Sequence, residues 1–270
     1  MTDRDQLARE PLPLRGRAAL VTGVSRRAGI GYAVARRMAA LGASLFLHRF
    51  EPHDRDQPWG ADPGGVGAVL DGVTQALAGG TVAERELDLT DPDAPGALVD
   101  AAVAAFGRLD ILVCNHARSG GDGPLGALSA AMLDAHWAVN ARSSILLAQA
   151  FTARHDGRSG GRIVFLTSGQ DLGPMRDEVA YAASKGALAS ITRTLADQLA
   201  DRGITLNTVN PGPVDTGWAT PAAREAVRAR FPSGRWGLPD DPARLIAWLA
   251  TDEAEWITGQ IINSEGGFRR

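Results

Sequence analysis

The chain has 270 residues, of which 44% are hydrophobic and 22% charged, and its formal net charge is −3. This length suits one large globular domain or two small ones, and the slightly acidic balance offers no basic surface for nucleic acid. The single cysteine, Cys114, excludes an internal disulfide, and we see neither a signal peptide nor a run of about 18 apolar residues, so we expect a cytoplasmic protein with no membrane span.

Apolar, β-prone runs alternate with segments of helical spacing along the chain. The runs that predict strands are 18–23, 44–48, 81–88, 109–115, 162–168, 204–210 and, more weakly, 259–267. The segments that predict helices are 30–41, 66–78, 92–106, 129–153, 180–200 and 240–250. The sequence therefore predicts an α/β fold, a single domain with a doubly wound, Rossmann-like parallel sheet of about seven strands and helices on both faces.

Three stretches fall outside this alternation. Residues 1–14 are polar and contain prolines, which predicts an N-terminal arm before one domain at 15–270. Long irregular stretches at 49–65 and 211–239 are expected to be functional or mobile. The second follows the carboxyl end of a predicted strand, where open α/β sheets bind ligands. Within this second stretch, segment 220–231 is consistent with two structures. One is a short, arginine-rich helical lid over a substrate, and the other is a solvated amphipathic face.

A glycine-rich turn, TGVSRRAGIG (22–31), connects the first strand to the first helix. Gly23, Gly29 and Gly31 permit a tight turn and a close approach of the backbone to a pyrophosphate. The helix that begins near Ile30 would point its backbone amides at the same anion. An ordinary strand-to-helix turn is the alternative, but the position in the first βαβ unit favours dinucleotide binding.

The residues after the second strand bear on which dinucleotide binds. An acidic residue there would bind the ribose hydroxyls of NAD, but the strand ends in His48 and Arg49. Arg49 could bind the 2′-phosphate of NADP, helped by Arg26 and Arg27, so we favour NADP(H) over NAD(H); the alternative is three solvated surface arginines. Asp88 ends the third strand and would meet the adenine, cap the next helix, or do both. The other candidates on this side are Ser25 and Leu89.

Tyr181 and Lys185 are four residues apart on a strongly helical segment, so they share one face. Lys185 is the only lysine in the chain, the other 27 of its 28 Lys and Arg residues being arginines. Ser168 ends a strand thirteen residues before Tyr181, and Asn140 lies in the long preceding helix. Together with TG-x₅-GIG and PGPVDT, this pattern resembles the short-chain dehydrogenase/reductase family over about residues 15–268, nearly the whole chain.

The chemistry of the Tyr181–Lys185 pair supports the resemblance. Hydride transfer to a carbonyl creates an alkoxide that needs a proton, and a tyrosine could supply it. Its usual pKa is about 10, and lowering that pKa to near neutrality requires roughly 4 kcal/mol. A cation at about 4 Å can provide this energy. The resemblance also implies that Lys185 binds the nicotinamide ribose. A compact ammonium can do both, and our hypothesis is that the pocket has no room for a guanidinium fork.

The resemblance implies roles for the remaining residues. Ser168 would hydrogen-bond the substrate oxygen, and Asn140 would position a water that relays protons to Lys185, unless it only kinks or packs its helix. The loop after the sixth predicted strand would turn beneath the nicotinamide and meet the carboxamide and diphosphate. The cofactor-binding residues expected in that loop are Pro211, Gly212, Val214 and Thr216, and those after the fourth strand are Asn115 and Ala117.

The chain departs from the family pattern at two places. Five residues separate Gly23 and Gly29 where the family usually has three, and the family's NNAG becomes Asn115-His116-Ala117-Arg118. We expect a hydrogen-bonded structural role for His116, and a redirected loop or a substrate contact for Arg118. Pro58-Trp59-Gly60 and the longer turn resemble bacterial members labelled 3-ketoacyl-carrier-protein reductase-like. That motif is expected to pack locally or at a subunit contact rather than to cover the adenine.

These features predict an NAD(P)-dependent oxidoreductase acting on a small carbonyl or secondary alcohol. A dinucleotide-binding regulatory protein without activity is the alternative, which the intact Asn–Ser–Tyr–Lys set disfavours, and the Tyr-to-Lys spacing disfavours enoyl reduction. We expect no metal site, because no metal-ligand cluster occurs. Small residues on the helices at 129–153 and 180–200 favour a homotetramer or homodimer, as the resemblance implies. The candidate substrate-binding residues are Arg118, Gln170 and Trp218.

Overall fold

The computed structural model describes residues 10–270, and its centre is one seven-stranded sheet in the order β3-β2-β1-β4-β5-β6-β7. Every neighbouring pair of strands is parallel. The strands are β1 (Ala18–Val21), β2 (Ser44–Arg49), β3 (Val82–Glu86), β4 (Ile111–Cys114), β5 (Gly161–Leu166), β6 (Ile204–Asn210) and β7 (Ile261–Asn263). All seven predicted strands and the doubly wound topology are therefore confirmed.

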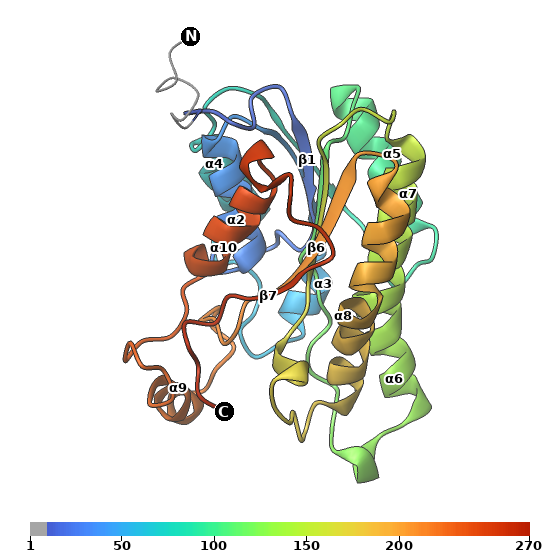
Figure 1. Cartoon of the computed structure of the whole chain (residues 1–270). Helices are drawn as coiled ribbons and strands as arrows, with labels where there is room; N and C mark the ends of the chain where they lie inside the picture. Colours follow the sequence, from blue (N-terminus) through green and yellow to red (C-terminus); the bar gives the residue numbers. More distant parts are fainter. Residues whose placement is uncertain (1–9) are drawn as a thin grey trace.

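Helices cover both faces of the sheet (Figure 1). On one face lie α2 (Ile30–Ala40), α4 (Gly65–Thr74) and α10 (Asp240–Leu249). On the other lie α5 (Ala94–Phe106), α7 (Ser143–Arg154) and α8 (Val179–Ala200). Each face encloses its own apolar cluster, so the central strands are buried on both sides. Strands β1 and β4 are buried throughout, which is why they are continuous apolar runs in the sequence.

The helix predicted at 129–153 is instead three consecutive pieces. It consists of α6 (Ala130–His136), a π-helical segment η2 (Trp137–Arg142) and α7. Such π-helical insertions add a residue to one turn and occur often at functional sites. The wider turn lies at Asn140, and hydrophobic periodicity alone does not show it.

The stretches predicted as irregular contain short helices. The first includes α3 (Glu51–Arg55), and the second includes α9 (Pro221–Arg228), within the segment for which a helical lid was one alternative. The predicted arm at 1–14 extends too far, because Leu14 belongs to the domain. Its side chain is fully buried in the core, and its backbone amide donates to the Leu41 carbonyl at the end of α2. Residues 1–9 of that arm lie outside the described residues.

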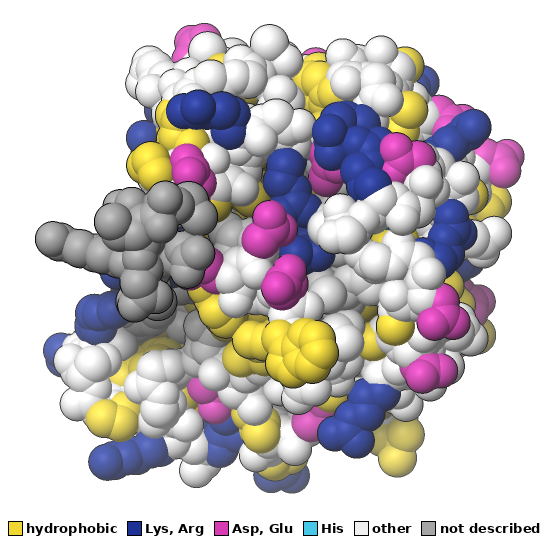
Figure 2. Space-filling model, turned by 45° about the horizontal axis from the view of Figure 1, so that its top comes forward, with side chains coloured by type: hydrophobic (Ala, Val, Ile, Leu, Met, Phe, Trp, Pro, Cys, Tyr) yellow, Lys and Arg dark blue, Asp and Glu magenta, His cyan; other side chains and the backbone are white. Residues whose placement is uncertain are grey.

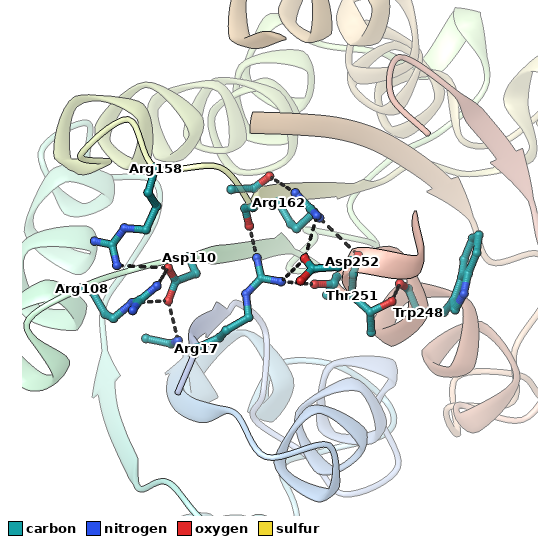
Figure 3. A network of polar contacts seen from close by, with 12 residues as sticks. Arg17, Arg108, Asp110, Arg158, Arg162, Trp248, Thr251 and Asp252 are labelled. Atoms are coloured by element: carbon teal, nitrogen blue, oxygen red, sulfur yellow. Dashed lines mark hydrogen bonds and ion pairs between the residues drawn. The ribbon is translucent and has the colours of Figure 1, made fainter. Parts of the chain in front are cut away.

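Charged side chains at the amino ends of the strands form paired networks. Asp110 binds the backbone amide of Ala18 and the guanidinium of Arg108, while Asp252 binds Arg17 and Arg162 (Figure 3). On the face drawn in Figure 2, arginines lie beside acidic side chains rather than in a field of one sign. Within residues 10–270, no helix is long and apolar enough to cross a membrane.

Candidate active site

One cavity of about 1270 Å³ opens at the carboxyl ends of the central strands, and most of the predicted site residues line it. Those that do are Gly23, Ser25, Arg26, Gly29, Ile30, Asp88, Leu89, Asn115, Ala117, Arg118, Ser168, Tyr181, Lys185, Pro211, Gly212, Val214, Thr216 and Trp218. Five predicted residues do not line it, namely Arg27, Gly31, Arg49, Asn140 and Gln170. The cavity therefore joins the dinucleotide candidates to the catalytic candidates.

The glycine turn leaves the start of α2 open to an anion. Gly23 has a φ of 72°, and a Cβ there would lie 2.8 Å from the Cα of His116. Gly31 lies behind the turn, where a Cβ would come within 2.5 Å of the Gly23 carbonyl oxygen. No side chain caps α2 at Gly29, and its first turn carries no acidic residue. Free backbone amides at a helix start fit the diphosphate of a dinucleotide.

Arg49, predicted to bind a phosphate, does not line the cavity. It ion-pairs with Glu51, Glu84 and Glu86, because β2 and β3 pair in a register that places Arg49 opposite Glu86. Arg27 is likewise bound by Asp62, with four hydrogen bonds to one carboxylate. Both arginines are already neutralised by carboxylates of the chain itself.

The segment from α3 to Trp59 forms a wall of the cavity, and Trp59 also packs locally against His53, as expected for Pro58-Trp59-Gly60. Asp54 holds both Arg26 Nε, at 2.9 Å, and the Trp59 indole, at 3.0 Å, and the Arg26 guanidinium lies over the Trp59 ring. Arg26 Nη1 also donates to the Thr216 carbonyl at 3.1 Å. Arg26 therefore connects the glycine turn, the α3 segment and the loop after β6.

Tyr181 and Lys185 project from one face of α8, as their spacing predicts. The Lys185 side chain is fully buried; its Nζ donates to the Leu166 carbonyl at 2.9 Å and lies 5.9 Å from the centre of the Tyr181 ring. Burial lowers the pKa of Lys185 to about 8. Desolvation and the nearby Glu178 raise the pKa of Tyr181 to about 12, and a hydrogen bond with Ser168 only partly opposes them. The expected lowering of the Tyr181 pKa is therefore wrong for the chain alone.

Asn140 holds backbone rather than facing the cavity. Its Oδ1 accepts from the Arg118 amide at 2.7 Å, and its Nδ2 donates to the Arg118 carbonyl at 3.1 Å and to Ser184 Oγ at 2.9 Å. Ser184 Oγ in turn donates to the Tyr181 carbonyl at 2.8 Å. Asn140 thus joins the loop after β4 to the turn of α8 that carries Tyr181, which agrees with the structural alternative considered for it.

Two buried histidines support the loops around the glycine turn. His116 Nδ1 lies 2.7 Å from Thr22 Oγ1, and its Nε2 lies 2.7 Å from Ser143 Oγ, so its predicted structural role is confirmed. Burial holds its pKa well below the usual value. His48 bonds the Gly23 amide and the Leu87 carbonyl, and burial lowers its pKa to about 4. Both rings are therefore neutral at physiological pH and act as hydrogen-bonding supports.

Asp122 is a site residue that the sequence reasoning missed. Its carboxylate accepts from the backbone amides of Ala180, at 3.0 Å, and Tyr181, at 2.7 Å, at the start of α8. Burial disfavours the charge, but the bonds from Tyr181, Ala180 and Gly123 prevail and lower the pKa of Asp122. No local signal identifies it, because a residue 59 positions away in sequence caps the helix.

The far end of the cavity is enclosed by the loop after β6, by α9 and by the last residues of the chain. Trp218 Nε1 donates to the Val214 carbonyl at 3.1 Å. Arg270 forms two hydrogen bonds to Glu265 and lies against Gly169 and Gly173, where a Cβ would collide with its side chain. Gln170, predicted to bind substrate, instead bonds Thr167 and Asp171. Arg270 thus occupies part of the wall expected from Gln170.

Comparisons with known proteins identify the family. A family model described as "Enoyl-(Acyl carrier protein) reductase" matches residues 23–269. "Uncharacterized oxidoreductase YjdA" of Bacillus subtilis is 44% identical over 255 residues, which are 93% of this chain and 96% of that protein. "NADPH-dependent aldehyde reductase-like protein, chloroplastic" of Arabidopsis thaliana is 33% identical, covering 99% of this chain and 100% of that one.

Solved structures agree with these relatives. A short-chain dehydrogenase from Burkholderia cenocepacia in complex with NADP superposes with a TM-score of 0.81 at 36% identity, covering 94% of this chain and 98% of that one. The chain belongs to the short-chain dehydrogenase/reductase family and is an oxidoreductase. Among residues 10–270, no group of three His, Cys, Asp or Glu side chains is arranged to hold a metal ion.

Proposed function

We propose that this enzyme transfers a hydride from NADPH to a carbonyl compound, or in the reverse direction from a secondary alcohol to NADP⁺, with Tyr181 as the acid/base. The observation that carries the proposal is that Ser168, Tyr181 and Lys185 line the same cavity as the uncapped start of α2. An anion-binding helix start beside a phenol is what a nicotinamide dinucleotide and a carbonyl together require.

The bound dinucleotide supplies the hydride, and the side chains manage the proton. Because its pKa is raised to about 12, Tyr181 is protonated at neutral pH and can donate its proton to the developing alkoxide. Ser168, which bonds Tyr181, orients the substrate oxygen and stabilises its growing charge. Lys185 places a cation at the base of the site, and Asn140 acts as a positioning residue for the loop after β4 and for α8.

NADP(H) is the cofactor that we favour over NAD(H). The support comes from the NADP complex of the Burkholderia cenocepacia relative and the NADPH-dependent naming of the Arabidopsis thaliana relative. Arg49 and Arg27 no longer contribute to this argument. Equilibrium titration of the purified enzyme with NADPH and NADH, followed by intrinsic fluorescence, tests it, and tighter binding of NADH would contradict it.

A dinucleotide-binding regulatory protein without activity remains the competing function. Oxidation of NADPH with a panel of ketones, aldehydes and an enoyl thioester separates the possibilities. We expect turnover of at least one ketone or aldehyde and none of the enoyl thioester, and we expect Tyr181→Phe to abolish it without weakening NADPH binding. NADPH binding without turnover of any compound would favour the regulatory function.

The substrate is expected to contact Trp218 at the far end of the cavity, under α9. We further propose that the enzyme assembles as a homotetramer or homodimer through α6, α7 and α8. Leu133 and Trp137 on this helical layer are about half exposed, at 41% and 47%, and would be covered in such an assembly. Analytical ultracentrifugation would measure the state directly, and a monomer at micromolar concentration would contradict the proposal.

A further inference from the structure

Arg118 is a cation that faces the cavity without a counter-ion. It follows β4, at the position where the resembling family has a glycine, and its side chain lines the cavity. Within residues 10–270 it makes no ion pair, and its Nε is buried without a hydrogen-bond partner. The terminal nitrogens of its guanidinium make no hydrogen bond or ion pair within these residues, so their N–H groups are free for an acceptor that a ligand brings.

The backbone of Arg118 is fixed independently of its side chain. Asn140 binds both the amide and the carbonyl of Arg118, and Asn140 is itself fully buried. The guanidinium therefore extends from a rigid base. Only the side chain, and not the backbone, therefore has to become ordered when Arg118 binds a ligand.

The Arg118 side chain and its loop lie beside the α3 segment of the cavity wall. A Cβ at Gly120 would lie 2.8 Å from Gln57 Oε1, so the loop after β4 meets the α3 segment directly. Burial lowers the pKa of His53 in α3, and the charge of Arg118 acts on that ring in the same direction. The other cavity arginine on this side, Arg26, is already paired with Asp54. On the substrate side, Arg270 is paired with Glu265, whereas Arg230 makes no ion pair within residues 10–270 and lies at the far end, near α9.

We propose that Arg118 binds a phosphate group of the dinucleotide. The inference rests on the proposed function, because it assumes that a nicotinamide dinucleotide occupies the cavity. A planar guanidinium binds phosphate oxygens through two parallel hydrogen bonds, and an unpaired guanidinium on the cavity wall beside α3 fits the diphosphate or the 2′-phosphate. A substrate carboxylate offers the same oxyanion chemistry, so the experiment separates these sources.

The test measures dissociation constants of NADPH, NADH and 2′,5′-ADP for the wild type, Arg118→Gln and Arg118→Lys. Loss of a charge-assisted hydrogen bond should weaken NADPH binding about tenfold or more in Arg118→Gln, with an intermediate effect in Arg118→Lys. Weakening of NADPH and 2′,5′-ADP but not NADH assigns the 2′-phosphate, and equal weakening of NADPH and NADH assigns the diphosphate. Arg36→Gln removes the same charge from an exposed arginine on α2 and should leave all three constants unchanged.

Unchanged dissociation constants in Arg118→Gln overturn the inference. They overturn it even if the KM of a keto acid rises relative to that of its methyl ester. That rise would show that Arg118 binds a substrate carboxylate instead. If the wild type itself binds no dinucleotide, the proposed function fails instead. Thermal unfolding checks that Arg118→Gln is folded; if it is not, Arg118→Lys decides, because unchanged NADPH binding on losing the planar fork would contradict bidentate binding.

Discussion

Asp122 accepts the backbone amide of Tyr181 at 2.7 Å, so a carboxylate from the loop after β4 caps the helix that carries the proposed acid/base. The residue that precedes α8, Glu178, makes no side-chain cap of its own. The negative charge of Asp122 also interacts favourably with the positive end of the helix dipole. The position of Tyr181 along the cavity therefore depends on a long-range contact as well as on its own helix.

Asp122→Ala should lower both stability and turnover. Loss of a helix cap costs about 1–2 kcal/mol, and freeing the first turn of α8 should reduce kcat severalfold while NADPH binding changes little. Asp122→Asn retains an oxygen acceptor, so its stability and kcat should lie between those of Asp122→Ala and the wild type. Ser129→Ala, which removes the cap of α6 at Met132, is the matched control and should lower Tm without a comparable fall in kcat. Equal kcat values for Asp122→Ala and the wild type would contradict the argument.

The parts of this molecule that sequence could predict are those fixed by local pattern. Strand order along the chain, the glycine turn and the shared face of Tyr181 and Lys185 all follow from spacing within one element. The ion pairs of Arg49 could not be predicted, because they depend on the register between β2 and β3, which places Glu86 opposite it. The Tyr181 pKa is raised rather than lowered, because desolvation and the charge of Glu178 act on it. Both come from the folded surroundings, which the spacing of Tyr181 and Lys185 does not show. The cap by Asp122 is likewise a tertiary contact.

Gly31→Ala should damage the glycine turn although the residue does not line the cavity. The added Cβ would lie 2.5 Å from the Gly23 carbonyl oxygen and 2.6 Å from Asn115 Nδ2, so the turn or the loop after β4 must move. Overpacking of this kind costs about 1–3 kcal/mol, and the displaced turn should bind NADPH more weakly. Gly67→Ala in α4 meets nothing within 4 Å and should raise stability slightly, with unchanged NADPH affinity. Calorimetry and fluorescence titration measure both effects.

Lys185→Arg should lose most of its activity. The ammonium is enclosed, with its Nζ on the Leu166 carbonyl, and a guanidinium is both larger and planar. We expect kcat to fall by about 10²-fold or more, as when a proton-transfer group is misplaced. Steady-state kinetics on a ketone reduced by the wild type, with folding checked by circular dichroism, measures the fall. Near-normal turnover would show that the pocket accommodates the fork and would remove the explanation for the single lysine.

Lys185 should also impose a pH dependence on stability. Its pKa is about 8 in the folded chain against 10.5 for an ordinary lysine, so the unfolded chain binds more protons between these values. Stability from this group therefore rises as pH increases, by about 2 kcal/mol between pH 7 and pH 9.5. The buried Cys114 beside it stays protonated, because burial raises its pKa. Urea unfolding of the wild type and Lys185→Met across this range should show the rise only in the wild type; parallel profiles would exclude a depressed lysine.

Asp110→Ala should destabilise the fold without touching the chemistry. Asp110 is 2% exposed and accepts from the first amide of β1, at 2.8 Å, and from Arg108 Nε, at 2.8 Å (Figure 3). Removing it leaves a buried backbone donor and an arginine without their acceptor, which should cost about 2–4 kcal/mol. Denaturant unfolding measures the loss, and the KM for NADPH should not change, because Asp110 lies at the amino ends of the strands.

A second aspartate separates this effect from a general loss of charge. Asp100 pairs with Arg154 on the helical surface, where both side chains are more than half exposed, at 53% and 55%. Exposed pairs contribute about 0–1 kcal/mol because water and salt screen them, so Asp100→Ala should be close to wild type. Added salt should weaken the Asp100 pair further and leave the Asp110 contribution largely intact, since the Asp110 carboxylate and the Ala18 amide that it binds are buried. Equal destabilisation by the two variants would mean that the Asp110 network contributes only surface electrostatics.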